Sequence, residues 1–180
     1  MRRIWTMGHS TRSLEELVET LKSYDIETVA DVRTVPRSRK NPQFNRQELE
    51  INLSEVGIEY IHEKDLGGLR KPLKDSPNSA WHNDSFRGFA DYMQTDGFQN
   101  ALNRLAELAA GRRTAIMCAE LLPWRCHRSL IADVLMTRGF DVIEIFDKHK
   151  SQPHKMTSFA VAQNGRISYP ATVAEANDAD

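Results

Sequence analysis

The segment Met117–Ser129 concentrates side chains that can do chemistry. Two thiols, Cys118 and Cys126, lie at either side of a short loop, and His127 and Arg128 follow the second thiol directly. A helix is expected to start at Cys126, and the exposed N–H groups and dipole of a helix start favour anions and lower the pKa of a thiol. This spacing predicts a reactive thiolate next to an imidazole.

The two cysteines leave several interpretations open. A thiolate here could act as a nucleophile with His9, His62 or His127 as its base, or as a redox thiol in a reversible disulfide. Either cysteine could instead be a small buried residue, as many free cysteines are. Consecutive residues at a helix start do not all face one way, so at most two of Cys126, His127 and Arg128 can share a site.

Metal binding is a further alternative. Seven residues separate Cys118 from Cys126, whereas the cysteines of structural zinc sites come in closely spaced pairs. A Cys/His site would therefore combine both thiols with a distant histidine, which is atypical. We expect no metal.

Polar side chains also follow four predicted strands at the point where each strand ends. They are His9 and Ser10, Asp31 and Arg33, His62 and Glu63, and Cys118 and Glu120. In open α/β sheets, ligands bind beyond the carboxyl ends of the strands. We therefore expect one crevice that brings these groups together, in which Asp31 or Glu120 orients its neighbours. A local backbone hydrogen bond or an ion pair with an arginine is the alternative role for Asp31.

The run Arg33–Arg46 carries five cations and no acid. Guanidinium groups such as those of Arg33 and Arg37 bind oxyanions through paired hydrogen bonds, so the run predicts a contact with phosphate or nucleic acid. The chain as a whole is nearly neutral, with 24 Lys and Arg against 25 Asp and Glu. A solvated charged loop is therefore the alternative interpretation.

The adjacent Gly67 and Gly68 form a third feature. Glycines let the backbone approach a ligand closely and offer N–H groups to it, although a plain turn uses the same residues. The chain contains no Walker motif and no dinucleotide fingerprint. We therefore expect no cofactor.

These groups must be positioned by the elements between them. Short apolar runs predict strands at Ile4–Met7, Glu27–Val32, Ile58–His62, Thr114–Cys118 and Asp141–Phe146. Amphipathic periodicity and end signals predict helices after Ser13, from Asn45 to Leu53, at Phe86–Met93, from Thr95 or Asp96 to Ala110, and from Cys126 to Thr137. Alternating strands and helices form βαβ units. The expected fold class is α/β, a mostly parallel open sheet with helices on both faces in a three-layer, Rossmann-like arrangement.

A single domain is expected from 180 residues. Residues 1–150 form its α/β body, and residues 151–180 add a C-terminal β-hairpin, signalled by Asn164-Gly165, and a frayed tail from Ala171. No apolar run approaches the roughly 18 residues of a membrane span. We recognise no signal peptide, and two cysteines make no disulfide framework. We therefore expect a cytoplasmic protein that does not contact membranes.

The ordered motifs of the chain resemble the domain-of-unknown-function 488 family. They are Gly8-His9-Ser10, Asp31-Val32-Arg33, Pro36-Arg37-Ser38, Asn41-Pro42-Gln43-Phe44, Leu66-Gly67-Gly68, Tyr92-Met93, Met117-Cys118-Ala119-Glu120 and Cys126-His127-Arg128. The resemblance runs from Ile4 to Phe146. It implies little about function beyond the suggestion, drawn from the two cysteines of the family, of an enzyme.

A looser similarity, at the level of the fold, is to rhodanese-like and Cys-based phosphatase folds, in which a strand delivers a cysteine into a loop that ends in Arg-Ser. Here the corresponding loop runs from Cys118 to Arg128-Ser129, with nine residues between Cys118 and Arg128. It is longer than the anion-binding loops of those folds. The similarity therefore concerns the fold alone.

The leading hypothesis is a thiol-dependent enzyme, a hydrolase or transferase, for a small anionic or nucleotide-like substrate. The candidate catalytic residues are Cys118, Cys126, His127, His9, Asp31 and Glu120, and the candidate substrate-binding residues are Arg33, Arg37, Arg128, Ser10, Gly67 and Gly68. The alternatives are a module that binds nucleic acid or another polyanion without turnover, and a Cys/His metal-binding protein. The sequence does not define an oligomeric state.

Overall fold

The computed structural model describes residues 2–172, and its elements follow the predicted order. The strands are β1 (Arg2–Gly8), β2 (Thr28–Asp31), β3 (Glu59–His62), β4 (Thr114–Cys118), β5 (Phe140–Ile145), β6 (Ser151–Pro153), β7 (Val161–Gln163) and β8 (Arg166–Ser168). The α-helices are α1 (Leu14–Ser23), α2 (Arg46–Glu55), α3 (Asp84–Tyr92), α4 (Asp96–Gly111) and α5 (Arg128–Thr137). Short 3-10 helices are η1 (Pro42–Phe44), η2 (Lys64–Leu66) and η3 (Pro123–Arg125).

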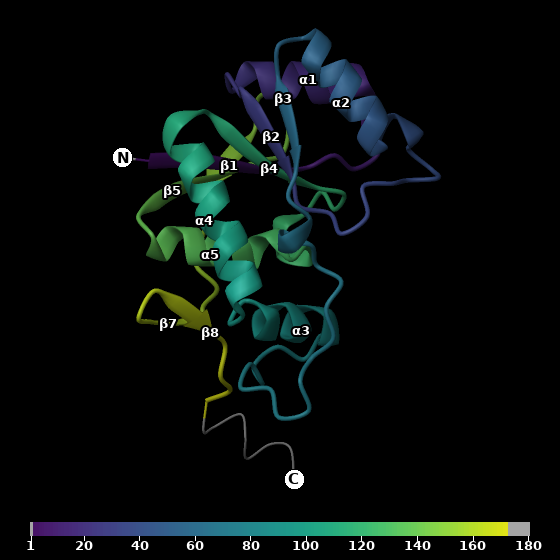
Figure 1. Ribbon diagram of the computed structural model, residues 1–180. Coiled ribbons are helices and arrows are strands. Elements are labelled where there is room, and N and C mark those ends of the chain that lie inside the picture. The colour runs from purple at the N-terminus through teal and green to yellow at the C-terminus, as the bar shows by residue number, and fades with distance from the viewer. Residues whose placement is uncertain (1, 173–180) are drawn as a thin grey trace.

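Six strands form one sheet in the order β3-β2-β4-β1-β5-β6 (Figure 1). The strands from β3 to β5 are parallel to their neighbours, and β6 pairs antiparallel with β5. The predicted α/β class, mostly parallel sheet and C-terminal hairpin of β7 and β8 are confirmed. The sequence does not predict β6, because three exposed residues ending in a proline carry no strand signal of their own.

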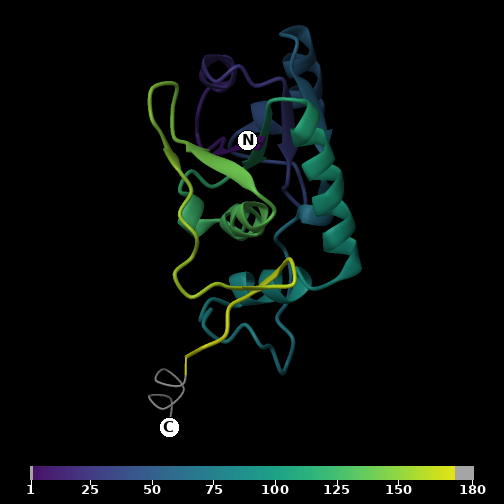
Figure 2. The ribbon, with the colours of Figure 1, turned by 90° about the vertical axis from the view of Figure 1, so that its left-hand side faces the viewer.

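The alternation of side chains along the strands divides the apolar core into two layers. In β1, Ile4 belongs to one layer and Trp5 and Met7 belong to the other. The first layer includes residues of α3, α4 and α5, and the second includes residues of α1 and α2. Helices therefore cover both faces of the sheet, as the two views show (Figures 1 and 2). The predicted three-layer arrangement is confirmed.

The strand order places a crevice at the carboxyl end of β4. This strand lies between β2 and β1. The chain leaves β1 and β2 toward helices on one face of the sheet, but it leaves β4 toward α5 on the opposite face. The loops part where this direction reverses, and ligands of open α/β sheets bind at such points. Cys118 is the last residue of β4.

Local hydrogen bonds explain where the first helices begin. Ser13 Oγ accepts from the Glu16 N–H at 3.1 Å, and a Glu16 carboxylate oxygen accepts from the Ser13 N–H at 2.9 Å, which confirms the predicted capping box of α1. Asn45 precedes α2 as predicted, but its side chain does not cap that helix. Its Oδ1 accepts instead from the Ser38 N–H at 2.7 Å and so holds the preceding loop.

The start of α5 differs slightly from the prediction. The helix begins at Arg128, whereas the sequence suggests a start at Cys126. The difference arises because η3 closes just before Cys126, whose backbone is extended. His127 then makes the turn into the helix. Cys126 therefore lies ahead of the first helical turn, where side-chain acceptors meet free N–H groups.

The C-terminal extension packs against α5 and joins the first core layer. Asp133 on α5 accepts hydrogen bonds from the Tyr169 hydroxyl at 2.8 Å and from His154 Nε2 at 2.8 Å. Because both donors follow β5, the extension is anchored to the α/β body by buried polar contacts. The predicted frayed tail, from Ala171, falls mostly on residues 173–180, which lie outside the described residues.

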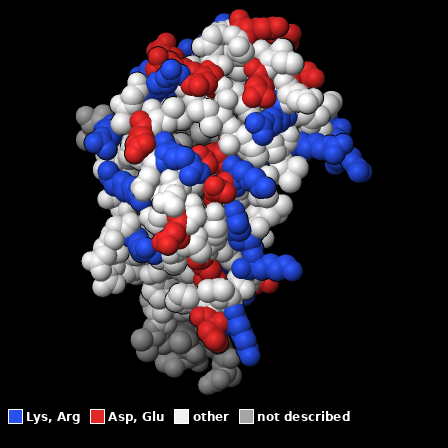
Figure 3. All heavy atoms as spheres, in the orientation of Figure 1, with Lys and Arg blue, Asp and Glu red and all other residues white. Residues whose placement is uncertain are grey.

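Positive and negative side chains are interspersed over the face of the molecule drawn in Figure 3. This mixture accords with a net charge of −1. The face drawn therefore carries no field of one sign. Within residues 2–172, no helix is both long enough and apolar enough to cross a membrane.

Candidate active site

A cavity of about 720 Å³ opens at the carboxyl ends of β1, β2 and β4. The sequence predicts twelve site residues, and the structure describes all of them. Nine of them line the cavity: His9, Ser10, Arg33, Arg37, Gly68, Cys118, Glu120, Cys126 and His127. The cavity falls within the size range of small-molecule sites. Side chains from separate segments thus meet in the crevice that the strand order creates.

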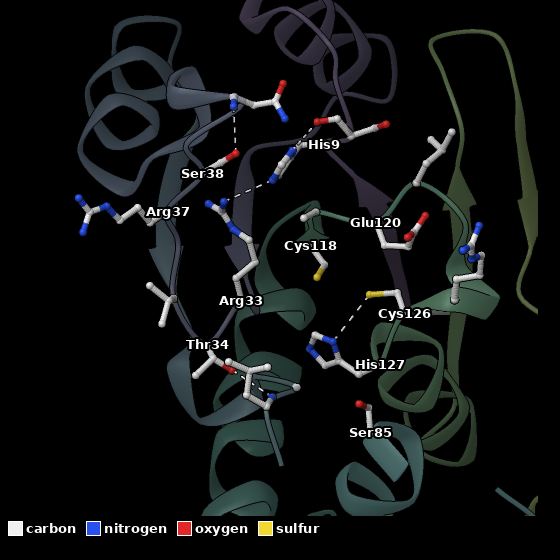
Figure 4. Close-up of a pocket in the computed structure, with 18 of the residues that line it drawn as sticks. His9, Arg33, Thr34, Arg37, Ser38, Ser85, Cys118, Glu120, Cys126 and His127 are labelled. Carbon is white, nitrogen blue, oxygen red and sulfur yellow. Dashed lines mark hydrogen bonds between the residues drawn. The ribbon is translucent and has the colours of Figure 1, made fainter. Parts of the chain in front are cut away.

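The two thiols lie together at the base of this cavity. In Figure 4 the sulfur atoms of Cys118 and Cys126 point into the same space. Both cysteines are free, and their sulfurs and a ring nitrogen of His127 all lie within 4.8 Å of one another. Residue exposures of 9% and 4% leave access from the cavity only. The seven-residue separation in sequence becomes direct contact in the fold.

The imidazole of His127 is oriented by the backbone. Its Nε2 lies 3.1 Å from the Val32 carbonyl oxygen and 3.0 Å from the Leu66 carbonyl oxygen. Since a carbonyl only accepts, Nε2 must carry a hydrogen. The Nδ1 atom, 3.7 Å from Cys126 Sγ, therefore presents its lone pair to the thiol when the ring is neutral. His127 is placed to accept the thiol proton.

The environment makes the two thiols unequal. A hydrogen bond from the Cys118 thiol, together with the charge and the backbone N–H of Arg128, lowers the pKa of Cys126 to about 7. The same thiol–thiol hydrogen bond and burial raise the pKa of Cys118. Cys126 is therefore the thiol that ionises first.

A buried ion pair fixes Arg33 beside the thiols. Its Nη2 donates to Asp31 Oδ2 at 2.6 Å and its Nε donates to Asp31 Oδ1 at 2.9 Å. The Tyr60 hydroxyl also donates to Asp31 Oδ2 at 2.6 Å. Asp31 is fully buried and does not reach the cavity. It acts as a positioning residue that holds the guanidinium group at the cavity wall.

The surroundings of His9, another candidate base that lines the cavity, favour its neutral form. Its Nδ1 donates to the Ser10 carbonyl oxygen at 2.9 Å, and its Nε2 accepts from Arg33 Nη1 at 3.3 Å. The ring also stacks on Phe44 with 4.2 Å between centroids. Burial lowers the pKa of His9 to about 4. His127, rather than His9, faces the thiols as a base.

Arg128, predicted to bind substrate, does not line the cavity. Arg128 is 1% exposed and turns inward, donating to Thr6 Oγ1 at 2.8 Å and to the carbonyl oxygens of Glu120 and Leu121. It therefore holds the loop after β4 instead of binding substrate. This result agrees with the expectation that at most two of the three consecutive residues at 126–128 share a site.

Gly67 and His62 also lie away from the cavity. A Cβ at residue 67 would come within 2.4 Å of Thr34 Oγ1, so Gly67 serves close packing. His62 Nε2 lies 2.8 Å from the Arg33 carbonyl oxygen, which turns its ring from the thiols. Neither residue lines the cavity.

The cavity has a polar rim that the sequence does not single out. It includes Arg125 from η3 and Asn83 and Ser85 from the start of α3. The unusually long loop at 69–85 is a signal that could have pointed to the last two. Figure 4 shows Arg37 turned outward at the edge of the cavity. The described lining residues include three arginines, of which Arg33 is already paired with Asp31, and one carboxylate, that of Glu120.

The same base could contact a metal ion. Cys118, Cys126 and His127 each offer a donor atom within the mutual distance of 4.8 Å. The hydrogen bonds from His127 Nε2 to backbone carbonyls resemble those that orient histidines at metal sites. Thiol chemistry and metal binding therefore compete for the same three atoms.

Fold and site together define an α/β domain with a thiol–imidazole pair in a cavity at the carboxyl edge of its sheet. The chain belongs to the family described as Domain of unknown function DUF488, which matches residues 13–135. This confirms the resemblance found in the sequence. The matched range contains Arg33, Cys118, Cys126 and His127. No curated protein and no solved structure matches the chain.

Proposed function

We propose that this protein is a thiol-dependent enzyme in which Cys126 attacks a small anionic substrate bound in the cavity. The observation that carries the proposal is the 3.7 Å approach of Cys126 Sγ to His127 Nδ1, with Nε2 of the same ring committed to two carbonyls. A cysteine paired with an oriented histidine is a recurrent nucleophile and base. The backbone carbonyls take the orienting role that a carboxylate or amide has elsewhere.

The reaction begins with transfer of the Cys126 proton to His127 Nδ1. The Arg128 N–H stabilises the thiolate that remains, and the carbonyls of Val32 and Leu66 stabilise the imidazolium. The sulfur lone pair then forms a bond to the electrophilic centre of the substrate. The bond to the leaving group breaks, and the leaving group takes the proton from Nδ1. A second nucleophile, such as water in a hydrolase, then gives its proton to His127 and displaces the sulfur, which restores the thiolate and the imidazolium.

The arginines of the cavity supply substrate recognition. Arg33 is held rigidly by Asp31, so it can meet an anion without first losing side-chain freedom. Arg37 and Arg125 are exposed at the rim and can adjust to the ligand. Charge-assisted hydrogen bonds from guanidinium groups suit carboxylates and phosphates. The expected substrate is therefore a small anion with an electrophilic centre near the sulfur.

Alkylation with a matched pair of reagents tests both parts of the proposal. Iodoacetate and iodoacetamide differ chiefly in charge, so the ratio of their rates reports the field at the thiol. We expect Cys126 to label faster than free cysteine at pH 7, and the ratio to favour iodoacetate by about tenfold relative to free cysteine. High salt should reduce this preference. Labelling of Cys126 only after denaturation would contradict the proposal.

Variants at the rim provide the control. Arg37→Gln with Arg125→Gln should lower the preference for iodoacetate, because both side chains line the cavity. Arg39→Gln should leave it unchanged, because this exposed arginine is outside the lining. Equal effects of both substitutions would show that bulk charge, not the cavity, sets the preference.

Elemental analysis of the purified protein separates thiol chemistry from metal binding. We expect well below about 0.1 equivalents of metal ion per chain, whereas a tight site is nearly fully occupied. A bound ion near one equivalent that blocks alkylation until a chelator removes it would replace the proposal with a metal-binding function.

A second candidate function is binding of nucleic acid or another polyanion without turnover. It is favoured by the exposed side chains of Arg37, Arg39 and Lys40, which adjoin the cavity on the loop after β2. Binding through several phosphates must weaken steeply as salt rises. A gel shift at low salt that disappears with Arg39→Gln and Lys40→Gln, while thiol reactivity stays ordinary, would favour this function.

A further inference from the structure

We propose that Cys118 and Cys126 form a reversible disulfide during turnover, with Cys126 as the attacking and Cys118 as the resolving thiol, and that the substrate is a small anionic disulfide. The inference rests on the proposed function in taking Cys126 as the nucleophile. It adds the identity of the second nucleophile and the class of substrate.

The closeness of the two sulfurs carries this inference. They lie within 4.8 Å of each other, while a disulfide needs about 2.05 Å. The proposed disulfide requires side-chain rotation to supply the remaining approach. Because the chain has two cysteines, no other thiol of the same chain competes for either sulfur.

The backbone holds the two cysteines in this relation. On one side, the His9 N–H donates to the Cys118 carbonyl oxygen at 2.9 Å. On the other, the Cys126 N–H donates to the Pro123 carbonyl oxygen at 3.0 Å. The buried Arg128 ties the loop between them to β1 through Thr6. The loop therefore presents both sulfurs at the cavity instead of leaving them to meet by chance.

The surroundings of the two thiols assign their roles. Cys126 contacts His127 and the N–H at the start of α5, which favour its thiolate and make it the attacking group. Cys118 ends a central strand in the first core layer and keeps its proton longer. The positive charge of Arg33 acts on Cys118 and favours its thiolate once the proton leaves.

A hydrolase would require only one of these sulfurs. A second sulfur beside the first is useful where the first sulfur is itself the atom to be attacked. Cys118 and His127 are the two residues whose donor atoms lie within 4.8 Å of the Cys126 sulfur in this cluster. The pair of sulfurs therefore indicates an adduct whose electrophilic atom is the sulfur of Cys126, which is a mixed disulfide.

The exchange balances in two steps. The Cys126 thiolate attacks one sulfur of the substrate disulfide, a bond forms between Cys126 and that half, and the other half leaves as a thiolate that takes a proton from His127. Cys118 then loses its proton to His127, its thiolate attacks the sulfur of Cys126, and the second half leaves as a thiolate that takes that proton. The substrate is reduced to two thiols, and the protein dithiol is oxidised to a disulfide. A reducing dithiol must return the protein for the next cycle.

The anionic disulfide 5,5′-dithiobis(2-nitrobenzoate) is the probe for this inference. When the reagent is limiting, we expect the reduced protein to release both halves of each molecule as free thiolate. The protein should become lighter by the two thiol hydrogens and carry no nitrobenzoate. Cys118→Ser should release one half rapidly and keep the other as a stable adduct on Cys126. Cys118→Ala provides the same test should the serine variant not fold.

The outcomes separate the inference from the proposed function. Rapid reaction of Cys126 with an adduct that persists in the wild-type protein would overturn the inference and leave a single-thiol enzyme. Reaction of Cys126 no faster than that of free cysteine would overturn the proposed function itself. Relative to free cysteine, Cys126 should react about tenfold or more faster with the anionic reagent than with the neutral 2,2′-dithiodipyridine, because a favourable field enhances rates. Such a preference supports the anionic class of substrate. Equal relative rates would contradict that class.

Discussion

Gly68 lies against the imidazole ring of His127: a Cβ at residue 68 would come within 2.6 Å of Nδ1 and 2.7 Å of Cγ. The ring cannot simply shift, because Nε2 donates to the carbonyl oxygens of Val32 and Leu66. The glycine thus permits the one ring position in which Nδ1 meets Cys126. Gly68, which also lines the cavity, therefore leaves room for the imidazole of His127.

Gly68→Ala should therefore slow alkylation of Cys126 at pH 7 by several-fold, because the displaced ring no longer accepts the thiol proton. Gly111→Ala is the matched control, since a Cβ at residue 111 would meet no described atom beyond its helical neighbours within 4 Å. The control should keep the labelling rate and gain about 0.5 kcal/mol of stability. Unchanged labelling in Gly68→Ala would contradict this role for the glycine.

The pH dependence of labelling should show the influence of Cys118 on Cys126. Alkylation of the wild-type protein should rise with pH and reach half its maximum near the lowered pKa of about 7. Cys118→Ala removes the thiol that donates to the Cys126 sulfur, so its inflection should move to higher pH. Cys118→Ser keeps a hydroxyl donor at residue 118 and should therefore shift the pH of the inflection less. An inflection that is the same in all three proteins would exclude the thiol–thiol hydrogen bond.

Asp31→Asn should destabilise the fold by about 3 kcal/mol in urea denaturation, because it leaves the buried guanidinium of Arg33 without its countercharge. Asp84→Asn is the matched control. Asp84 pairs with Arg87 on the surface, with 75% of the Asp84 side chain exposed, so its loss should change stability little. Equal effects of the two substitutions would refute the role of Asp31 as an anchor.

Stability should fall as pH rises from 6.5 toward 9, through the titration of His154. Its two ring nitrogens lie 2.7 Å from Glu144 and 2.8 Å from Asp133, and these hydrogen bonds outweigh burial and raise its pKa to about 9. Because the pKa of His154 is raised in the folded state, its full contribution to stability is present below pH 6.5. This contribution is lost as pH rises through the folded pKa of about 9. The loss should amount to about 3 kcal/mol.

The measurement is thermal or urea unfolding of the wild-type protein, His154→Gln and His82→Gln across this pH range. His154→Gln should be less stable at pH 6 and lose most of the pH dependence. His82→Gln alters an exposed histidine and should follow the wild-type profile. A wild-type profile that stays flat to pH 9 would rule out a charged His154 between the two carboxylates.

Local patterns along the chain predict β1 to β5 and α1 to α5 in their observed order, although they miss β6. The strand predicted at Thr114–Cys118 has those bounds in the structure, and the capping box of Ser13 and Glu16 starts α1. Hydrophobic periodicity and caps act over a few residues, so a linear string records them. The Asn-Gly turn at residue 164 likewise indicates the hairpin, because its backbone preference is local.

The site depended on relations between distant segments. Strand order, which sets β4 between β1 and β2, brought Cys118 to the carboxyl edge beside Arg33. Packing decided that Cys126 and His127 face the cavity while Arg128 turns to the core. The hydrogen bonds that orient His127 are accepted by the carbonyl oxygens of residues 32 and 66. Side-chain direction and protonation depend on neighbours remote in sequence, so only the tertiary structure could decide which of the reactive residues act together.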